Sequence, residues 1–318
     1  MQILITGGAG FIGSNIALTL QKLYPEAEIT VLDNFTSGNF KNLENFKGEF
    51  IAGDIRSKEL WDYLGRKYSF DVVFHQAAIT DTTVEDQNYM LEVNTNAFKY
   101  LLDTALERWG AKVIYASSAA VYGNCPAPMR EDGCLKPENV YGFSKLMMDN
   151  LAFKYLRKYQ NAAIIGLRYF NVYGFGEAHK GKFASMVYQL MAKMVRGEKP
   201  RLFKWGEQKR DFVYIKDVVK ANLLAMEKGI GGVYNVGSGR ARSFNELVAI
   251  LNEVLGTDFD IEYFDNPYDF YQNYTEADLT KISNVLGYKP DWSLEEGVRD
   301  YFQTLKEKGI IDKLLRNK

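Results

Sequence analysis

The first half of the chain alternates short apolar runs with longer stretches of helical periodicity. The apolar runs lie at Met1–Thr6, Glu28–Leu32, Val72–His75, Lys112–Ala116 and Ala163–Leu167. Helical patterns lie at Ser14–Leu23, near Val93–Trp109 and at Tyr141–Lys158. Continuous apolar runs are typical of parallel strands that are buried on both faces. Strands separated by helical crossovers predict an α/β fold, a Rossmann-type doubly wound parallel sheet.

The second half has a different pattern from residue 174 onward. Helices are predicted near Phe183–Arg196 and Phe244–Leu255, and loops with charged and aromatic residues separate them. An apolar run at Val233–Val236, followed by Gly-Ser-Gly, predicts a strand that returns to the sheet near residues 233–237. We therefore expect a Rossmann domain over residues 1–173 and a smaller α/β substrate-binding lobe over residues 174–318.

Composition and charge are those of an ordinary soluble enzyme. Of the 318 residues 47% are hydrophobic and 25% are charged, and the net charge is −1. A chain with so little net charge has no basic field that would attract nucleic acid or anionic lipid. Its apolar runs are far shorter than the ~20 residues that a membrane span needs, and it begins without signal-peptide features. We expect a cytoplasmic protein that binds neither nucleic acid nor membranes.

The cysteines and histidines do not form a metal-binding pattern. Cys125 and Cys134 lie in one proline-containing stretch without the spacing of metal ligands. A disulfide between them is the alternative to two free thiols, and a reducing cytoplasm favours the thiols. The chain has 2 histidines, of which His75 ends an apolar run and is interpreted as a packed residue. No metal site is predicted.

A glycine-rich turn follows the first apolar run. It reads Gly-Gly-Ala-Gly-Phe-Ile-Gly from residue 7 to residue 13 and opens a helical pattern. A strand, Gly-x-x-Gly-x-x-Gly and a helix together direct backbone N–H groups at a pyrophosphate. Gly7 permits the tight turn, Gly10 admits the phosphate and Gly13 lets the helix approach the strand. We therefore predict that Gly7, Gly10, Phe11, Ile12 and Gly13 bind a dinucleotide.

A carboxylate suited to an adenosine ribose ends the second apolar run. Asp33 lies about 20 residues beyond Gly13, where a carboxylate accepts hydrogen bonds from both ribose hydroxyls and repels a 2′-phosphate. The residues from Asn34 to Gly38 are neutral, and Lys41 is the nearest cation after them. These residues favour NAD over NADP. Further cofactor contacts are expected at Asn34, Asp54, Ile55 and Ala77.

Three further side chains form a candidate acid/base group. Tyr141 and Lys145 are four residues apart, so they share one face of a helix. A free phenol has a pKa of about 10, but an adjacent ammonium and the positive charge of an oxidised nicotinamide stabilise the phenolate and lower that pKa. Ser118 follows the run Lys112–Ala116, at the edge where open α/β sheets bind ligands. It can bond to the hydroxyl that Tyr141 deprotonates.

These motifs resemble the short-chain dehydrogenase/reductase superfamily, in its extended form that modifies nucleotide sugars. The likeness rests on the glycine run, on Asn-Val-Tyr-Gly at residues 139–142 and on Arg-Tyr-Phe-Asn-Val-Tyr-Gly at residues 168–174. It implies a tightly bound NAD(P) and a nucleotide sugar as the small-molecule substrate. Runs at residues 177–185, 209–214 and 271–279 extend a resemblance to the ADP-L-glycero-D-manno-heptose 6-epimerases nearly from end to end.

This closer resemblance implies an isomerase of lipopolysaccharide core heptose precursor synthesis. Such an epimerase oxidises C6 of ADP-glycero-manno-heptose to a 6-keto intermediate and reduces it from the other face. Tyr141 and Lys180 would be acid/base groups at opposite walls of the site, assisted by Ser118 and Lys145. The alternative for Lys180 is a pairing with a substrate phosphate or with Glu177. The resemblance also implies NADP and a homo-oligomer, a pentamer.

The resemblance also assigns binding residues. It places Asn94, Val172 and Lys180 at the cofactor, together with Tyr141 and Lys145. It places Ser118, Asn171, Lys182, Gln189, Phe203, Arg210 and Tyr271 at the substrate, with Arg210 clamping the diphosphate. Three positions depart from the family pattern: Lys182 replaces a serine, Gln189 replaces a histidine, and Trp205 lies in a shortened loop. These departures affect contacts with the sugar and the nucleotide.

A UDP-hexose 4-epimerase, of the UDP-glucose/galactose type, is the main alternative because it shares every motif of the first half. The His-Lys-Gly run at residues 179–181 argues against it. A 4,6-dehydratase would need an Asp-Glu pair just after the catalytic serine, where this chain has Ala119 and Ala120. A non-catalytic binding protein is disfavoured because Ser118, Tyr141 and Lys145 are all present.

Overall fold

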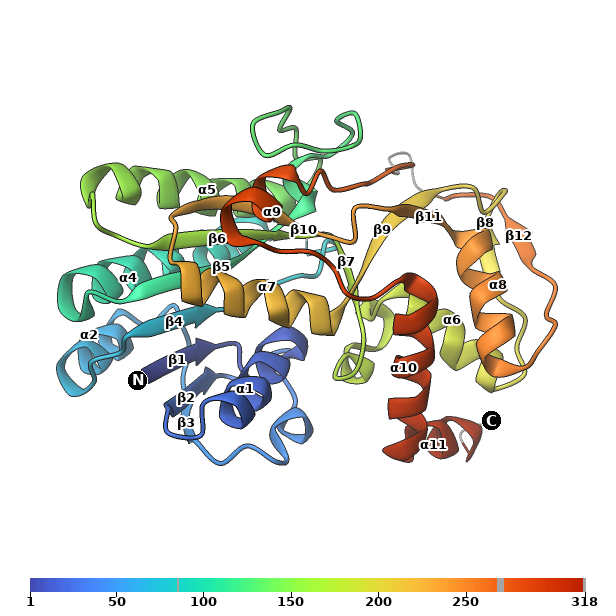
Figure 1. The fold of residues 1–318 in the computed structure, drawn as a ribbon, viewed down its shortest axis with the longest axis horizontal. Coiled ribbons are helices and arrows are strands. Elements are labelled where there is room, and N and C mark those ends of the chain that lie inside the picture. The colour runs from blue at the N-terminus through green and yellow to red at the C-terminus, as the bar shows by residue number, and fades with distance from the viewer. Residues whose placement is uncertain (85, 268–271, 317–318) are drawn as a thin grey trace.

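A parallel β-sheet lies at the centre of the larger part of the protein (Figure 1). The computed structural model describes residues 1–84, 86–267 and 272–316. Across the sheet, the described strands follow the order β10 (Gly232–Val236), β6 (Ile164–Tyr169), β5 (Lys112–Ser118), β4 (Val72–His75), β1 (Gln2–Thr6), β2 (Glu28–Asp33) and β3 (Glu49–Ala52). Every neighbouring pair is parallel. The predicted Rossmann-type doubly wound sheet is confirmed.

Helices cover both faces of the sheet (Figure 1). On one face α1 (Phe11–Leu23) packs against α7 (Ile215–Lys228), and on the other lie α2 (Lys58–Lys67), α4 (Ala97–Thr104) and α5 (Val140–Lys158). Successive strand residues point to opposite faces. Ile3 and Ile5 therefore share a core with α1 and α7, whereas Leu4 shares one with α2, α4 and α5. Because both faces are covered, the inner strands β1, β4, β5 and β6 are mostly apolar.

The carboxyl ends of the strands meet at one edge of the sheet. In the register of the ladders, Thr6 pairs with His75, and Ser118 pairs with Tyr169. The strand order reverses at β1, which has β2 on one side and β4 on the other. Such a reversal leaves a crevice outside the strand ends, where α/β proteins bind their ligands. This edge positions the candidate site.

Two predicted helices begin at different residues than expected, and the residues that precede each helix explain its first residue. α1 begins at Phe11, directly after the glycine turn, rather than at Ser14. α5 begins at Val140 because the side chain of Asn139 accepts a hydrogen bond from the backbone N–H of Gly142 at 2.8 Å. Asparagine is among the preferred residues at this position, since its oxygen satisfies a donor that the helix leaves unpaired.

The helix predicted near Val93–Trp109 is longer and less regular than expected. Its segments are α3 (Gln87–Leu91), the π-helical η2 (Glu92–Asn96), α4 and the π-helical η3 (Ala105–Trp109). It begins early because the side chain of Asp86 accepts a hydrogen bond from the N–H of Tyr89 at 2.9 Å. It ends at Gly110, whose positive φ of 64° suits glycine.

The second half forms two small sheets and also returns to the large one. The remaining elements are η1 (Phe40–Leu43), η4 (Ala119–Val121), β7 (Asn171–Tyr173), η5 (Ala178–Phe183), α6 (Met186–Val195), β8 (Arg201–Phe203), β9 (Lys209–Tyr214), β11 (Ala241–Ser243), α8 (Phe244–Leu255), β12 (Glu262–Phe264), α9 (Thr280–Leu286), α10 (Leu294–Glu307) and α11 (Ile310–Arg316). β11, β9 and β7 form one small sheet, and β12 and β8 form the other. β10 returns to the large sheet where a strand was predicted, whereas α7 was not predicted. No helix in the described ranges is long and apolar enough to cross a membrane.

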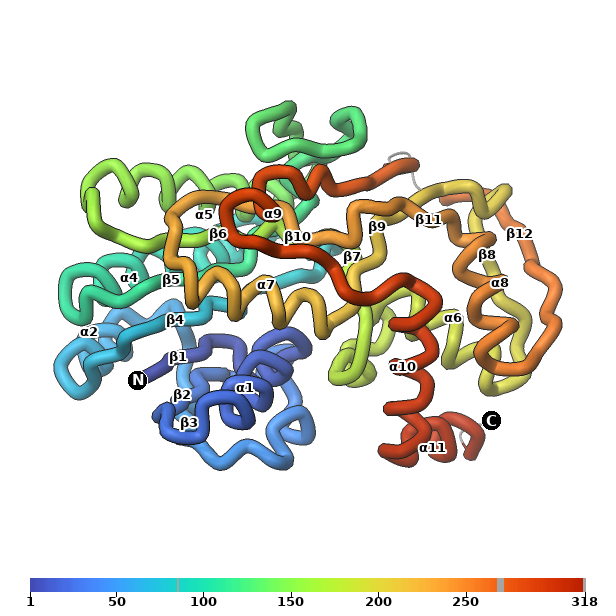
Figure 2. The backbone as a smooth tube through the Cα atoms, viewed as in Figure 1, coloured from blue at the N-terminus to red at the C-terminus, as the bar shows by residue number. Residues whose placement is uncertain are grey.

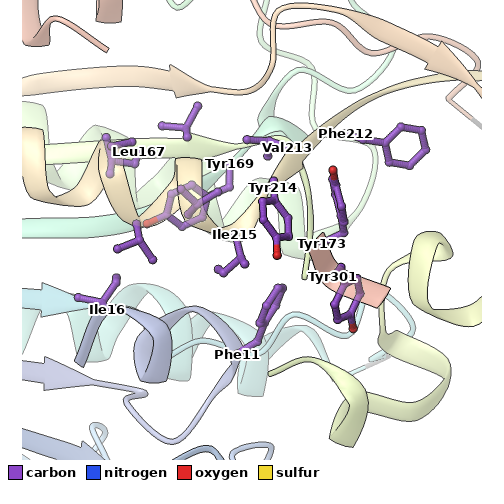
Figure 3. Packing of buried hydrophobic residues seen from close by; sticks show 14 of the residues in the cluster. Phe11, Ile16, Leu167, Tyr169, Tyr173, Phe212, Val213, Tyr214, Ile215 and Tyr301 are labelled. Atoms are coloured by element: carbon purple, nitrogen blue, oxygen red, sulfur yellow. The ribbon is translucent and has the colours of Figure 1, made fainter. Parts of the chain in front are cut away.

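One apolar core joins the two halves of the chain. Figure 3 shows Phe11 of α1 close to Tyr214 and Ile215, with Tyr173 and Tyr301 in the same cluster. The ring centres of Tyr173 and Tyr214 lie 5.2 Å apart. The first helix of the Rossmann sheet therefore shares buried contacts with β7, β9, α7 and α10. Buried side chains from both halves of the chain therefore belong to one apolar cluster.

The segment between α9 and α10 also connects the two parts. Figure 2 shows the chain after α9 passing beside α7 before it reaches α10. The buried carboxylate of Asp217 on α7 accepts hydrogen bonds from the N–H groups of Asp291 at 2.8 Å and of Trp292 at 3.2 Å. Lys220, one turn further along α7, forms an ion pair with Asp291 at 2.7 Å. These contacts fix the path of the segment across the helix.

The two cysteines form a disulfide, so the expectation of free thiols was wrong. The Cα atoms of Cys125 and Cys134 lie 5.8 Å apart because the loop between them folds back on itself. The N–H of Met129, at the middle of this loop, donates a hydrogen bond to the carbonyl oxygen of Glu276 at 2.7 Å. A long-range contact of this kind brings the cysteines together, and it leaves no signal in the local sequence.

A charged pair is buried beneath the carboxyl edge of the sheet. Arg168 of β6 and Asp149 of α5 are 1% and 0% exposed, and Arg168 Nε donates to Asp149 Oδ2 at 3.0 Å. The hydroxyl of Tyr115 on β5 donates to Asp149 Oδ1 at 2.8 Å. Arg168 Nη1 donates to the hydroxyl of Tyr122 at 2.9 Å. These bonds satisfy a pair that water does not reach, and they tie α5 to two strands.

We expect Asp149→Ala to lower the free energy of unfolding by about 3–5 kcal/mol, because it leaves the guanidinium of Arg168 buried without its counter-charge. Urea denaturation at neutral pH measures this difference. Glu262→Ala is the control, since Glu262 pairs with Arg201 at the surface, where such a pair contributes at most about 1 kcal/mol. Equal losses in the two variants would contradict the role of the buried pair.

Candidate active site

A cavity of about 860 Å³ opens at the carboxyl edge of the sheet. It is lined by the glycine turn, by residues at the ends of β2, β4 and β5, and by residues of α5, β7 and η5. Its volume is within the range of about 300–1,000 Å³ that is common for small-molecule sites. The predicted residues that line it are Gly7, Gly10, Phe11, Ile12, Gly13, Asp33, Asn34, Asp54, Ile55, Ala77, Ser118, Tyr141, Lys145, Asn171, Val172 and Lys180.

The glycine turn lies so close to its neighbours that side chains do not fit. A Cβ atom on Gly7 would lie 2.5 Å from the backbone nitrogen of Ala77, and Gly7 has a φ of 67°. A Cβ atom on Gly13 would lie 2.3 Å from the carbonyl oxygen of Gly7. The helix α1 starts directly after this turn at Phe11, so its first N–H groups face the cavity without intrahelical partners. This cradle fits a pyrophosphate.

Asp33 is held at the end of β2 by two backbone N–H groups. Its Oδ2 accepts a hydrogen bond from Ala9 at 2.9 Å, and its Oδ1 accepts one from Phe35 at 2.8 Å. The residue is 8% exposed. A carboxylate has about four lone-pair directions, so these two bonds leave acceptor capacity for hydroxyl groups in the cavity.

Arg56 is a cavity residue that the sequence analysis did not single out. Its guanidinium forms an ion pair with Asp54 at 2.7 Å and lies 5.2 Å from the ring centre of Tyr89, which also lines the cavity. The hydrogen bonds from Arg56 hold the pKa of the Asp54 carboxyl below its usual range. In the sequence Arg56 lies two residues after Asp54, a predicted cofactor contact. This spacing could have indicated that Arg56 lines the same cavity.

Tyr141 and Ser118 lie together at the cavity wall, as predicted. Ser118 Oγ accepts a hydrogen bond from the N–H of Ala120 at 3.1 Å, which leaves the serine proton for another acceptor. Burial raises the pKa of Tyr141, and its hydrogen bond with Ser118 opposes part of that rise. The sequence argument expected a lowered pKa. In the protein alone the loss of water around the phenol is the larger effect.

Lys145 is buried one helical turn beyond Tyr141. Its ammonium donates to the carbonyl oxygen of Ala116 at 2.8 Å and lies 5.9 Å from the ring centre of Tyr141. Burial lowers the pKa of Lys145 to about 8, and the charge of Asp149 opposes this shift. The ammonium is thus held near the phenol without a direct contact to solvent.

Lys180 lines the same cavity. It belongs to η5, in the second half of the chain, and its ammonium lies 5.8 Å from the ring centre of Phe11. Burial lowers its pKa, and the charge of Glu177 opposes the shift. Glu177 nevertheless forms no ion pair with Lys180 within 4.0 Å in the part of the chain that the structure describes.

Asn94 supports the cavity from behind instead of lining it. Its Oδ1 accepts a hydrogen bond from the N–H of Ile79 at 2.8 Å, and its Nδ2 donates to Ser144 Oγ at 3.0 Å. Ser144 in turn donates to the carbonyl oxygen of Tyr141 at 2.7 Å. The contact of Asn94 with a cofactor stays a prediction, and in this structure the Asn94 side chain is buried and bonded to Ile79 and Ser144.

Four predicted substrate residues lie outside the cavity lining, namely Lys182, Gln189, Phe203 and Arg210. Gln189 donates to the carbonyl oxygens of Lys182 at 3.1 Å and Ala184 at 2.7 Å, so it braces the turn that carries Lys180. Arg210 is 8% exposed and lies 5.8 Å from the ring centre of Phe244, a cavity residue. Phe203, at the end of β8, meets the ring of Phe264 edge to face, with the ring centres 4.9 Å apart. Tyr271 lies outside the described residues.

His75 is a packed residue, as the sequence analysis proposed. Its Nδ1 lies 2.7 Å from the hydroxyl oxygen of Thr6, and its ring stacks on Phe98. Burial lowers its pKa to about 3, so the imidazole is neutral. Among the described residues no cluster of three or more His, Cys, Asp or Glu side chains could hold a metal ion.

Comparison with known proteins assigns this architecture to a family. The profile of the NAD dependent epimerase/dehydratase family matches residues 3–237. The chain belongs to this family. Its glycine cradle and Asp33 fit the nicotinamide dinucleotide that the family name implies.

Solved structures of other members share the whole fold. The ADP-L-glycero-D-manno-heptose-6-epimerase of Helicobacter pylori is 47% identical, with 96% of each chain covered and a TM-score of 0.90. The UDP-glucose 4-epimerase of Thermotoga maritima, solved with UDP-glucose, is 33% identical, with 97% of this chain and 99% of that chain covered and a TM-score of 0.90. The UDP-glucuronic acid 4-epimerase of Bacillus cereus, solved with UDP-glucuronic acid and NAD, is 28% identical, with 97% and 100% covered and a TM-score of 0.84.

Proposed function

We propose that this protein is a nucleotide-sugar epimerase that inverts C6 of ADP-glycero-manno-heptose through a 6-keto intermediate, in lipopolysaccharide core heptose precursor synthesis. The observation that carries the proposal is the presence of Tyr141 and Lys180 in one cavity, contributed by different halves of the chain. A second acid/base group is useful if the ketone turns between the two hydride steps, because the hydroxyl then points to a different wall before and after the reaction. The 47% identity to the Helicobacter pylori heptose epimerase supports the choice of sugar.

One wall is suited to the first proton transfer. When bound, an oxidised nicotinamide would take a hydride from the carbon that bears the hydroxyl and later return it. Tyr141, hydrogen-bonded to Ser118, would remove the hydroxyl proton as the ketone forms. The ammonium of Lys145, 5.9 Å from the ring centre, would stabilise the phenolate.

Lys180 would act at the other wall. Burial lowers the pKa of its ammonium, so that it releases a proton more readily than the ammonium of an exposed lysine does. After the ketone turns in the cavity, Lys180 would donate the proton to the new hydroxyl while the carbon regains its hydrogen from the opposite face. Its distance of 5.8 Å from the ring centre of Phe11 places it beside the glycine turn. The assembly of the chain as a homo-oligomer stays a prediction.

A UDP-hexose 4-epimerase is the second candidate, since the Thermotoga maritima UDP-glucose 4-epimerase has an equal TM-score of 0.90. We expect the purified protein to epimerise ADP-glycero-manno-heptose and to leave UDP-galactose unchanged. With deuterium at C6, the product should keep its label at C6, because the same hydride leaves and returns. NMR spectroscopy of the product checks both points. Turnover of UDP-galactose alone would identify the second candidate, and loss of deuterium to water would contradict the ketone route.

We expect Tyr141→Phe to retain the dinucleotide but to lose at least ~100-fold in kcat, which is the scale of one acid/base group. The substitution removes the hydroxyl and leaves the ring that packs at the start of α5. Rate measurements with ADP-glycero-manno-heptose, together with the absorbance of the bound dinucleotide, test this. Tyr89→Phe is the matched control because Tyr89 lines the same cavity without a proposed proton transfer. A rate in Tyr141→Phe close to that of the control would contradict the assignment.

NAD is proposed as the cofactor because Asp33 would repel a 2′-phosphate, while the charge of Arg56 is compensated by Asp54. Asp33→Asn removes that repulsion, so we expect NADP to gain at least ~10-fold in affinity relative to NAD. Titration of both dinucleotides by fluorescence measures the ratio. Asp81→Asn, in the loop after β4, serves as control and should change the ratio by less than ~2-fold. An unchanged ratio in Asp33→Asn would show that this carboxylate does not select the cofactor.

A further inference from the structure

Glu177 is a fully buried carboxylate in the segment that carries Lys180. Its Oε1 accepts hydrogen bonds from the N–H of Gly174 at 3.0 Å and from the hydroxyl of Ser185 at 2.9 Å. Its Oε2 accepts one from the N–H of Ser185 at 2.5 Å. A buried carboxylate costs several kcal/mol unless hydrogen bonds compensate it. Here all of these bonds connect the two ends of one segment.

The two anchoring points belong to regular elements. Gly174 directly follows β7, which carries Asn171 and Val172 at the cavity. Ser185 is the N-cap residue of α6, because its hydroxyl oxygen also accepts a hydrogen bond from the N–H of Tyr188 at 3.2 Å. Glu177 therefore joins the end of a strand to the beginning of a helix and closes the intervening chain into a loop.

Hydrogen bonds fix both the internal shape of this loop and its position against the glycine turn. The N–H of Lys180 donates to the carbonyl oxygen of Glu177 at 2.9 Å, and the chain turns at Gly181, whose φ is 55°. On the cofactor side, Asn42 Nδ2 lies 3.3 Å from His179 Nδ1 and also donates to the carbonyl oxygen of Ala9 at 3.1 Å. The loop thus rests on the glycine turn, with the ammonium of Lys180 toward the ring of Phe11.

We propose that Glu177 is the positioning residue of Lys180: its carboxylate closes the segment from Gly174 to Ser185 and so fixes the lysine ammonium at the cavity wall. This inference rests on the proposed function, in which Lys180 transfers a proton. Glu177 acts through the backbone, because its two oxygens bond to Gly174 and Ser185 and not to the lysine. A displacement of about 1 Å at a reacting group is enough to cost ~100-fold in rate.

The test is a double-mutant cycle of Glu177→Gln and Lys180→Ala. Glutamine keeps the shape of the side chain but turns an NH₂ group toward donors at Ser185. The substrate is whichever of ADP-glycero-manno-heptose and UDP-galactose the wild-type protein epimerises. We expect kcat of Glu177→Gln to fall about 10–100-fold, with KM changed less than ~3-fold. The double variant should match Lys180→Ala within ~2-fold, because the lysine to be positioned is gone.

Asp217→Asn provides the matched control. Asp217 is also a buried carboxylate that accepts two backbone N–H bonds, from Asp291 and Trp292, and it does not line the cavity. We expect it to lower the melting temperature while kcat stays within ~2-fold, because Asp217 is remote from the cavity and does not position Lys180. If Glu177→Gln does not fold, Ser185→Ala replaces it in the cycle, since it removes the hydroxyl contact with Glu177 at 2.9 Å, together with the cap on the N–H of Tyr188, and keeps the bond from the backbone N–H of Ser185.

The outcomes separate the two claims. If Lys180→Ala is slow and the effect of Glu177→Gln on kcat multiplies with it, or if Asp217→Asn lowers kcat as much as Glu177→Gln does, the positioning role is wrong and the proposed function stands. If Lys180→Ala keeps the wild-type kcat, or if neither sugar is epimerised, the proposed function fails and the positioning role fails with it. Non-additive loss of kcat in the Glu177 cycle alone supports the inference.

Discussion

The burial of the Lys145 ammonium is the constraint on which the active-site edge depends. A cation that is 1% exposed keeps its charge only if oxygen atoms surround it. The carbonyl oxygen of Ala116 lies 2.8 Å away, and Asp149 contributes a negative charge one helical turn along α5. Asp149 in turn needs Arg168 and Tyr115 to satisfy its own oxygens. Two strands and a helix are therefore fixed relative to each other by a charge that serves the site.

Most strands of the larger sheet could be predicted because the pattern that marks each of them lies within a few consecutive residues. Strands that are buried on both faces are mostly apolar, and the glycine turn must be small where Gly7 and Gly13 approach other backbone atoms. By contrast, α7 was missed because its sequence is half polar, and its place beside α1 depends on tertiary contacts. The disulfide of Cys125 and Cys134 was missed for a related reason, since a contact with the distant residue Glu276 folds the loop.

The residues of the candidate site also divide into those that local sequence predicts and those that tertiary packing places. Residues at strand ends, such as Asp33 and Ser118, were found from position alone, because parallel strands place their carboxyl ends at one edge. The bonds of Asn94 to Ile79 and Ser144 are set by three-dimensional packing and were not predicted. The approach of Arg210 to within 5.8 Å of the ring centre of Phe244 depends on packing in the same way. A residue type indicates chemistry, whereas its neighbours decide whether it reaches the cavity.

The opposing shifts at Tyr141 connect the fold to the chemistry. Burial raises the pKa of its phenol, and the single hydrogen bond with Ser118 does not reverse that rise. Lys145 is near enough to favour the phenolate, but burial lowers its own pKa to about 8, so its charge is easily lost. A second positive charge close to both groups would favour the phenolate and at the same time disfavour the lysine cation. An oxidised nicotinamide carries such a charge, so the phenol should become a base only when the dinucleotide is in place, which ties proton removal to the presence of a hydride acceptor.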